Sequence, residues 1–274
     1  MPPVPHRYRS PWTRTLDLAD ELRRWCSWWR RPHRPRRAVQ TVRDHLAAAP
    51  ASVCYAFTLF VTYWTLRGAN EITDRHIIFS ASTNLANMRR DPVQVLVASA
   101  FWVDGDFPWE FIITFLTVMA AAERWLGTLR WIGVFAIGHV GATLGTVTGI
   151  AYAVEHRLIP LRVALASDVG PSYGMSAVLA ALTFRLRGVP RLLWAGLLIV
   201  VYVGAAVRGR TFTDYGHVLA MTIGFLIAGS AVFTTRRLER ESAAHGLGPG
   251  PVLLDEADGG FDQPGGDRPE YRHQ

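Results

Sequence analysis

The stretch WIGVFAIGHVGATLGTVTGIAYAV, residues 131–154, decides the class of fold to which this chain belongs. It contains no aspartate, glutamate, lysine or arginine. A membrane-crossing helix needs roughly 20 mostly apolar residues to cover a hydrocarbon layer about 30 Å thick. Backbone amides cannot stay unpaired in lipid, so a run of this length must be a helix rather than a strand. The stretch therefore predicts a transmembrane helix.

Five more apolar runs lie on either side of this predicted helix. They cover residues 50–66, 109–122, 170–186, 192–207 and 215–233. Glu110 dilutes the second of the six runs, and Ser172 and Ser176 dilute the fourth. We expect an all-α integral membrane protein with six transmembrane helices in a membrane domain over residues 50–235.

The first 49 residues carry a strong positive charge. They hold eleven arginines against four acidic residues. Such a bias marks the cytoplasmic side of a membrane protein. The arginines that flank the six runs divide evenly between the two sides, so the arm of residues 1–49 sets the topology. We expect a multi-pass plasma-membrane protein with both termini in the cytoplasm. No base-reading module accompanies the arginines, so no nucleic-acid partner is expected.

Within this arm, Leu18, Leu22, Trp25 and Trp29 recur with helical spacing among arginines. That pattern predicts an amphipathic helix lying in the lipid headgroups, which makes the bilayer itself a partner. A solvated basic tail is the alternative. The following RRPHRPRR, residues 30–37, is expected to be extended.

The loop over residues 67–108 is long but not hydrophilic, which predicts short helices at the outer membrane surface. Residues 236–274 are rich in glycine, proline and acidic residues, which predicts a disordered cytoplasmic tail. Cys26 and Cys54 lie in different environments and predict neither a disulfide nor a zinc site. We expect no cofactor and no bound metal.

Glycines recur through the third run at Gly138, Gly141, Gly145 and Gly149. Small residues at this spacing let helix backbones approach closely, so we expect tight helix packing here. His139 in the same stretch is interpreted as a hydrogen-bonded interior histidine.

Two polar clusters, residues 167–177 and 211–217, enter the fourth and sixth runs. With the N-terminus inside, both runs pass from outside to inside, so both clusters lie at outer helix ends. Ser172 and His217 each follow a few residues later and reach similar depths at about 1.5 Å per residue. A serine and a histidine so placed could act as nucleophile and base.

Acidic residues near these helix starts would support that chemistry. Asp214 is predicted to cap the sixth helix, which makes His217 about its third residue. The positive helix end then favours a neutral imidazole. Asp168 or Ser167 is predicted to cap the fourth helix in the same way.

Taken together, these features resemble the rhomboid family of intramembrane serine proteases, and more closely its divergent bacterial rhomboid-like proteins. The resemblance covers roughly residues 52–233. It implies a rhomboid-like six-helix core, a long outer loop after the first helix, a G-x-S-G serine opening the fourth helix and a histidine in the sixth. The matching stretches are STNLANMRRDPVQVLVASAFWVDG, ERWLGTLRW, GHVGATLG, DVGPSYG and TFTDYGH.

Single residues match the family motifs unevenly. His217 with Ala220 and Gly224 resembles H-x-x-G-x-x-x-G, with alanine in place of the first glycine. Glu123 and Gly127 fit the E-x-x-L-G that ends rhomboid helix two.

The serine motif has two candidates. Gly170 precedes Ser172 in G-x-S, but the bulky Tyr173 follows where rhomboids keep a small residue. Gly174 precedes Ser176 in G-x-S-A, a closer local match. Both serines share one helix face. Ser172 is preferred as nucleophile because its depth matches His217, and Ser176, about one turn deeper, is the alternative.

Two family features are missing. Active rhomboids carry H-x-x-x-N on helix two, but this chain has no histidine and no asparagine between Pro92 and Ile132. Losing such an oxyanion donor costs on the order of 10²–10³ in rate. The aromatic residue four positions after the rhomboid serine is also absent, because Ser176 follows Ser172 there and Ala180 follows Ser176.

These departures favour a pseudoprotease that binds transmembrane helices of partner proteins, with the Ser–His pair as a structural hydrogen bond. The alternative is an intramembrane serine protease that uses Ser172 or Ser176 with His217. A transporter is disfavoured, because the sequence shows neither an internal repeat nor discontinuous helices with paired charges.

Overall fold

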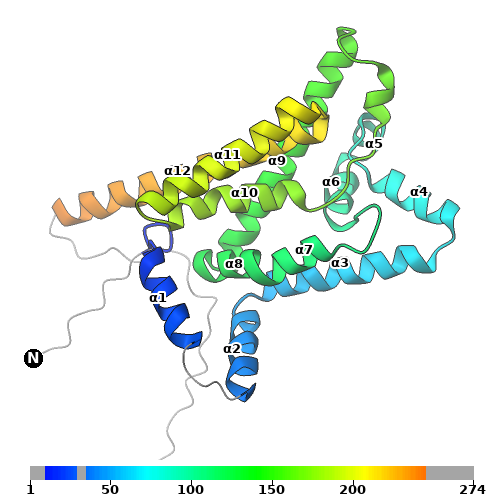
Figure 1. Cartoon of the computed structure of the whole chain (residues 1–274). Coiled ribbons are helices and arrows are strands. Elements are labelled where there is room, and N and C mark those ends of the chain that lie inside the picture. The colour runs from blue at the N-terminus through cyan, green and yellow to red at the C-terminus, as the bar shows by residue number, and fades with distance from the viewer. Residues whose placement is uncertain (1–9, 30–34, 245–274) are drawn as a thin grey trace, which may run out of the picture. The chain divides into compact units, whose positions relative to one another are not determined.

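A computed structural model of the chain describes residues 10–29 and 35–244. Residues 9–236 form one compact unit, and the second unit contributes only residues 237–244 to the described part. The helices are α1 (Leu18–Trp29), α2 (Pro35–Ala47), α3 (Pro50–Gly68), α4 (Glu71–Ala81), α5 (Leu85–Arg90), α6 (Pro92–Phe101), α7 (Trp109–Thr114), α8 (Ala120–Leu126), α9 (Thr128–Glu155), α10 (Ser172–Leu182), α11 (Val189–Gly209) and α12 (Phe212–Ala244) (Figure 1).

Each of the six predicted membrane runs is helical. The second run is α7 and α8 joined by a π-helical segment, Phe115–Met119, and the fourth is α10 followed by the 3₁₀ turn Thr183–Arg185. Within the described residues, three helices, α9, α11 and α12, are long and apolar enough to cross a membrane. The number rises to four if the bent pair α2 and α3 is counted as one span. The all-helical membrane class is confirmed, but the count of six is not.

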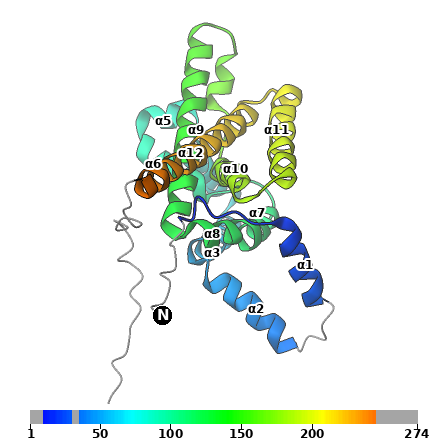
Figure 2. The same cartoon turned by 90° about the vertical axis from the view of Figure 1, so that its left-hand side faces the viewer.

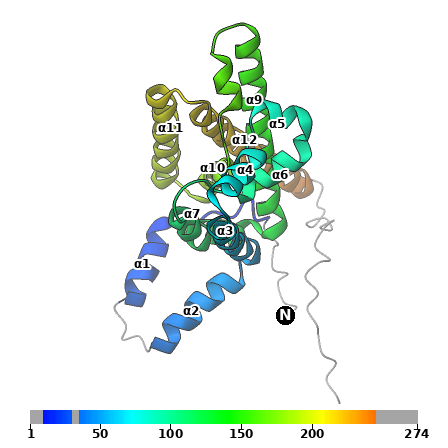
Figure 3. The same ribbon diagram turned by 90° about the vertical axis from the view of Figure 1, so that its right-hand side faces the viewer.

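Helix α10 lies between α9 and α11 when the molecule is viewed from either of two opposite sides (Figures 2 and 3). Gly138 of α9 meets the Ala177 side chain, and Gly224 of α12 meets the Ala177 backbone carbonyl. Gly141 and Gly145 contact side chains of α12, whereas Gly149 has no neighbour within 4 Å of an added Cβ. The predicted close packing is confirmed at three of the four glycines of α9.

Aromatic side chains fill the core between α3, the π-helical segment and α9. Tyr55 stacks on Phe115 with ring centroids 4.3 Å apart, and Trp131 stacks on Phe135 at 5.3 Å. Burying such rings stabilises the fold through their large apolar area and ring geometry. This cluster fixes α3 against α9, and α9 in turn packs on α10.

The E-x-x-L-G stretch has a structural role. The buried Glu123 of α8 accepts hydrogen bonds from Ala51 N at 3.0 Å and Ser52 N at 2.7 Å, at the start of α3. The Thr128 hydroxyl donates to the same carboxylate at 2.8 Å. A carboxylate at a helix N-terminus satisfies free N–H groups and complements the helix dipole. Gly127, at φ +82°, makes the turn into α9.

The N-terminal arm departs from its prediction in part. Helix α1 is confirmed as a helix, while its place in the headgroups stays a prediction. Residues 35–37, expected to be extended, form the first turn of α2, where Pro35 is well tolerated. Residues 30–34 lie outside the described part. Ahead of α1, Trp12 packs edge-on against Trp125, whose indole N–H donates to Pro11 O at 2.9 Å.

The long loop after α3 forms short helices, as predicted, although their place at the membrane surface stays a prediction. Each begins at a side-chain cap: Asn70 for α4, Asn84 for α5 and Asp91 for α6. At the other end of the chain, α12 continues to Ala244. The prediction of disorder was therefore wrong for residues 236–244, and residues 245–274 lie outside the described part.

Candidate functional site

The segment before α10 is tied to the loop helices. Asp168 N donates to Ser82 Oγ at 2.8 Å, and Thr83 N donates to Asp168 O at 3.1 Å. Gly170 N donates to Ser99 O at 2.7 Å. Gly170 has φ +130°, a conformation that favours glycine, which gives this motif residue a backbone role. The loop thereby positions the start of α10 and its two serines.

The two candidate serines have different surroundings. Ser172 is the first residue of α10, is half-buried, and its hydroxyl makes no hydrogen bond to any described residue. Ser176 is buried one turn deeper. Its oxygen lies 2.8 Å from Ser172 O and 2.9 Å from Tyr202 Oη. A hydroxyl carries one proton, and a carbonyl oxygen can only accept. Ser176 therefore donates to Ser172 O and accepts from the Tyr202 hydroxyl.

His217 lies between two tyrosines. Its ring stacks on Tyr202 at 5.8 Å and meets Tyr173 edge-on at 5.0 Å. Across residues 10–29 and 35–244, no hydrogen bond joins His217 to Ser172 or to Ser176. The structure therefore brings the predicted residues into one region without a Ser–His hydrogen bond.

Tyr173, the bulky residue inside the serine motif, occupies the space between α10 and α12. Its hydroxyl donates to Asp168 Oδ2 at 2.7 Å. A Cβ added to Gly216 would collide with the Tyr173 ring, so the absence of a side chain at Gly216 makes room for the tyrosine. The next residue, Gly174, packs against the Phe135 ring of α9. Tyr173 stands where rhomboids keep a small residue, and the glycine directly before His217 makes room for its ring.

Asp168 does not cap α10, contrary to the prediction. Pro171 is the N-cap, and no side chain bonds the first turn. The Asp168 carboxylate instead accepts from Tyr173 and, at 3.4 Å, from the Thr213 hydroxyl of α12. Burial raises the pKa of this carboxyl above its ordinary value, and the two hydrogen bonds partly oppose that rise. Asp168 links α10 to α12.

Asp214 has a different capping role from the one predicted. Thr211 is the N-cap of α12, and its hydroxyl oxygen lies 3.1 Å from Asp214 N. The Asp214 carboxylate accepts from Thr211 N at 3.1 Å, which completes a reciprocal capping box. His217 is therefore the sixth helical residue rather than about the third. The field of the helix end, which falls off within the first turn, acts on it less than predicted.

Sequence reasoning missed Tyr202. It lies on α11 and supplies an aromatic ring that stacks on His217. Trp194, Leu198 and Tyr202 recur every four residues, and they form the face of α11 that turns toward α10. A hydroxyl in an otherwise apolar run was the available signal.

His139 is an interior histidine, as predicted. Its Nε2 lies 3.2 Å from both Ser99 Oγ and Leu96 O, and its side chain is buried. Its ring lies 6.4 Å from that of Tyr173. The contacts of His139 with Ser99 and Leu96 fasten α6 to α9. They do not place an oxyanion donor beside Ser172 or Ser176.

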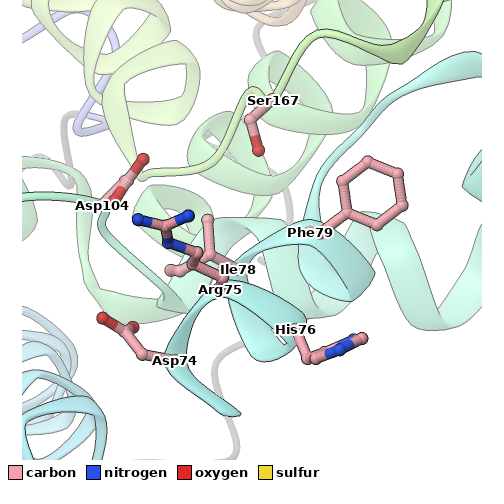
Figure 4. A pocket seen from close by; sticks show the side chains of 7 residues that line it. All are labelled: Asp74, Arg75, His76, Ile78, Phe79, Asp104 and Ser167. Carbon is pink, nitrogen blue, oxygen red and sulfur yellow. The ribbon is translucent and has the colours of Figure 1, made fainter. Parts of the chain in front are cut away.

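A surface cavity of about 420 Å³ lies beside the site rather than in it. Figure 4 shows the Arg75 side chain lying between those of Asp74 and Asp104. Arg75 also pairs with Glu71 at 2.6 Å. Ser167, predicted as a possible cap of α10, lines this cavity instead. In the described part of the chain, no group of histidine, cysteine and acidic side chains is arranged to hold a metal ion.

The fold and site define an all-helical membrane protein in which a short buried helix carries two serines beside a histidine of the last helix. The family model described as "Rhomboid-like protein" matches residues 44–236, which is more than half of the chain. The chain therefore belongs to the rhomboid-like protein family. Comparison with curated proteins and with solved structures gives no match.

Proposed function

We propose that this protein is a non-catalytic rhomboid-like membrane protein that binds transmembrane helices of partner proteins. The observation that carries the proposal is the bonding of Ser176. Its hydroxyl is engaged by Tyr202 and by the Ser172 carbonyl, while Tyr173 and Tyr202 flank the imidazole of His217. A serine nucleophile needs a base within hydrogen-bond reach, which neither serine has here.

The missing oxyanion donor also supports a non-catalytic protein. Between Pro92 and Ile132 the sequence holds no histidine or asparagine, and His139 is bonded to Ser99 and Leu96. The Ser176–Tyr202 contact then acts as a hydrogen bond between α10 and α11. We further propose six membrane spans in the plasma membrane, with both termini cytoplasmic.

A protease remains the second candidate because of one observation. Ser172 is half-buried, and its hydroxyl is free of hydrogen bonds to the described residues. Tyr173, the next residue, contacts the His217 ring, so Ser172 would approach the imidazole only if its side chain rotated and Tyr173 moved aside. Ser172 would then attack a substrate peptide bond, with His217 as base and then acid.

A serine-reactive fluorophosphonate separates the two candidates. Purified protein is incubated with the probe beside Ser172→Ala, Ser176→Ala and His217→Ala, with an active rhomboid protease as positive control. Ser230→Ala, at an exposed position on α12, is the matched serine control. We expect no labelling of the intact protein. Labelling that is lost in one of the two site serines and in His217→Ala would overturn the non-catalytic proposal.

Helix binding needs its own test. A photo-crosslinking amino acid is placed at the exposed Val200 of α11 and, as control, at the buried Leu198. Irradiation in native membranes should give adducts only from Val200, and mass spectrometry should map the captured peptides to membrane-spanning segments. Adducts confined to soluble segments, or none, would contradict the binding proposal.

The proposed topology is tested with fusions to the C-terminus. A fluorescent protein that folds only in the cytoplasm should be bright, and a phosphatase that is active only outside should be silent. A dark fluorescent fusion and an active phosphatase would place the C-terminus outside. That result would contradict six spans that start from a cytoplasmic N-terminus.

A further inference from the structure

Helix α2 turns sharply away from the first predicted membrane span. Residues 39–47 of α2 and residues 50–68 of α3 meet at 95° across a break of two residues. Figure 1 shows α2 turning away from the N-terminal end of α3. A helix perpendicular to one that crosses the bilayer lies along the membrane surface. The inside of the corner between them then faces the lipid.

That inside corner is an open apolar groove of about 800 Å³. Val39, Val42 and Leu46 of α2 line one wall, and Val53 and Cys54 of α3 line the other. Val42 is 58% exposed, and apolar side chains that gather in an exposed patch mark a membrane-, protein- or ligand-binding site. A groove of this size and composition is within the range of ligand pockets.

The groove carries one cationic side chain, Arg43, among its described lining residues. Arg43 lines it and forms no ion pair with any carboxylate of the described residues. Behind the groove, Arg124 of α8 bonds His45 Nδ1 at 2.8 Å, which holds α2 in position. A guanidinium matches the geometry of a phosphate and binds it through paired hydrogen bonds.

We propose that the corner between α2 and α3 is a binding site for an anionic phospholipid. One acyl chain lies in the groove against Val42 and Val53, and the phosphate contacts Arg43. The site rests on the proposed membrane crossing of α3 but is independent of catalysis. An anionic headgroup is favoured over a zwitterionic one because basic side chains near a membrane surface attract net negative lipid charge.

Cys54 reports on the groove directly because it lines the groove and is exposed. In a Cys26→Ser background it is the only thiol of the chain. The full-length protein in neutral detergent is treated with a water-soluble maleimide while phosphatidylglycerol or phosphatidylcholine is added. Phosphatidylglycerol should slow alkylation of Cys54 several-fold, and phosphatidylcholine much less.

Variants identify the side chains that are responsible for the protection of Cys54 by phosphatidylglycerol. Arg43→Glu should weaken phosphatidylglycerol protection on the order of tenfold, and Val42→Asp should also remove it. Val42→Leu should keep it, and so should Arg162→Glu, the same charge change at an exposed site elsewhere. Circular dichroism checks that each variant is folded, and native mass spectrometry counts the bound lipid.

Equal protection by the two lipids would overturn the anionic site, and so would undiminished protection in Arg43→Glu. The protease test is unaffected by either result. If α3 does not cross the membrane, Cys54 in sealed vesicles will react with the water-soluble maleimide whatever the lipid, which separates failure of the span from failure of the site.

Discussion

Helices α10 and α11 are neighbours with opposite surroundings. Eight of the eleven residues of α10 are buried, whereas α11 buries only Leu198 and Ala206 among its described side chains. Helix α10 consists largely of alanine, serine and glycine. Gly138 of α9 and Gly224 of α12 let the backbones of α9 and α12 approach α10 closely. Lipid is as apolar as leucine, so close contact rather than hydrophobicity decides which helix is central. The large side chains of α11 remain outside.

The strongest way to break this contrast is Gly224→Leu. A side chain there would collide with the Ala177 backbone carbonyl, which cannot move without displacing α10. We expect a loss of at least about 3 kcal/mol in the free energy of unfolding, at the upper end of overpacking costs. Thermal unfolding in detergent measures it. Gly196→Leu on α11 is the matched control, because no atom lies within 4 Å of its added Cβ, and an equal loss there would refute the contrast.

Tyr202→Phe tests the one hydroxyl by which α11 is bonded to Ser176. Interhelical hydrogen bonds in membranes contribute about 0.6 kcal/mol on average and up to about 1.7 kcal/mol. We expect a destabilisation of about 1 kcal/mol, with stacking on His217 retained. A double-mutant cycle with Ser176→Ala measures the coupling, and a coupling energy near zero would mean that the contact does not hold α11.

Asp168→Asn tests the link between α10 and α12 through pH. Burial raises the folded-state pKa of Asp168 above 3.8, so the folded protein binds this proton more tightly than the unfolded chain. Stability from this group is complete below pH 3.8 and is lost as pH rises through the raised folded pKa. The asparagine imitates the protonated form and should therefore raise the stability of the folded protein at neutral pH. Melting temperatures from pH 4 to 8 check this, and an unchanged pH slope in the variant would contradict it.

Val200→Ala should have the smallest effect. Val200 is 71% exposed on the lipid-facing side of α11, so truncation removes few protein contacts. We expect a change within about 0.5 kcal/mol, as for other exposed sites. The buried Leu198→Ala, at 6% exposure, should cost at least about 2 kcal/mol in the same unfolding assay. Similar losses at the two positions would mean that α11 is packed on both sides.

Local signals in the sequence located much of the site. The polar clusters identified the start of α10 and the start of α12, and the glycine spacing of α9 predicted close packing. The sequence carries the capping box as T-x-x-D from Thr211 to Asp214, whereas the prediction of Asp214 as the cap puts the helix start three residues too late. A one-turn error of this kind changes the place of His217 relative to the helix end.

Sequence patterns predict the apolar runs, the helical membrane class and the rhomboid-like resemblance, because hydrophobic length and motif spacing are local properties of the chain. The tertiary structure alone decided that Tyr202 of α11 stacks on His217, that Tyr173 fills the space beside Gly216, and that α2 meets α3 at 95°. These contacts join residues of different helices. Their geometry follows from how closely the helices pack, which no single segment encodes.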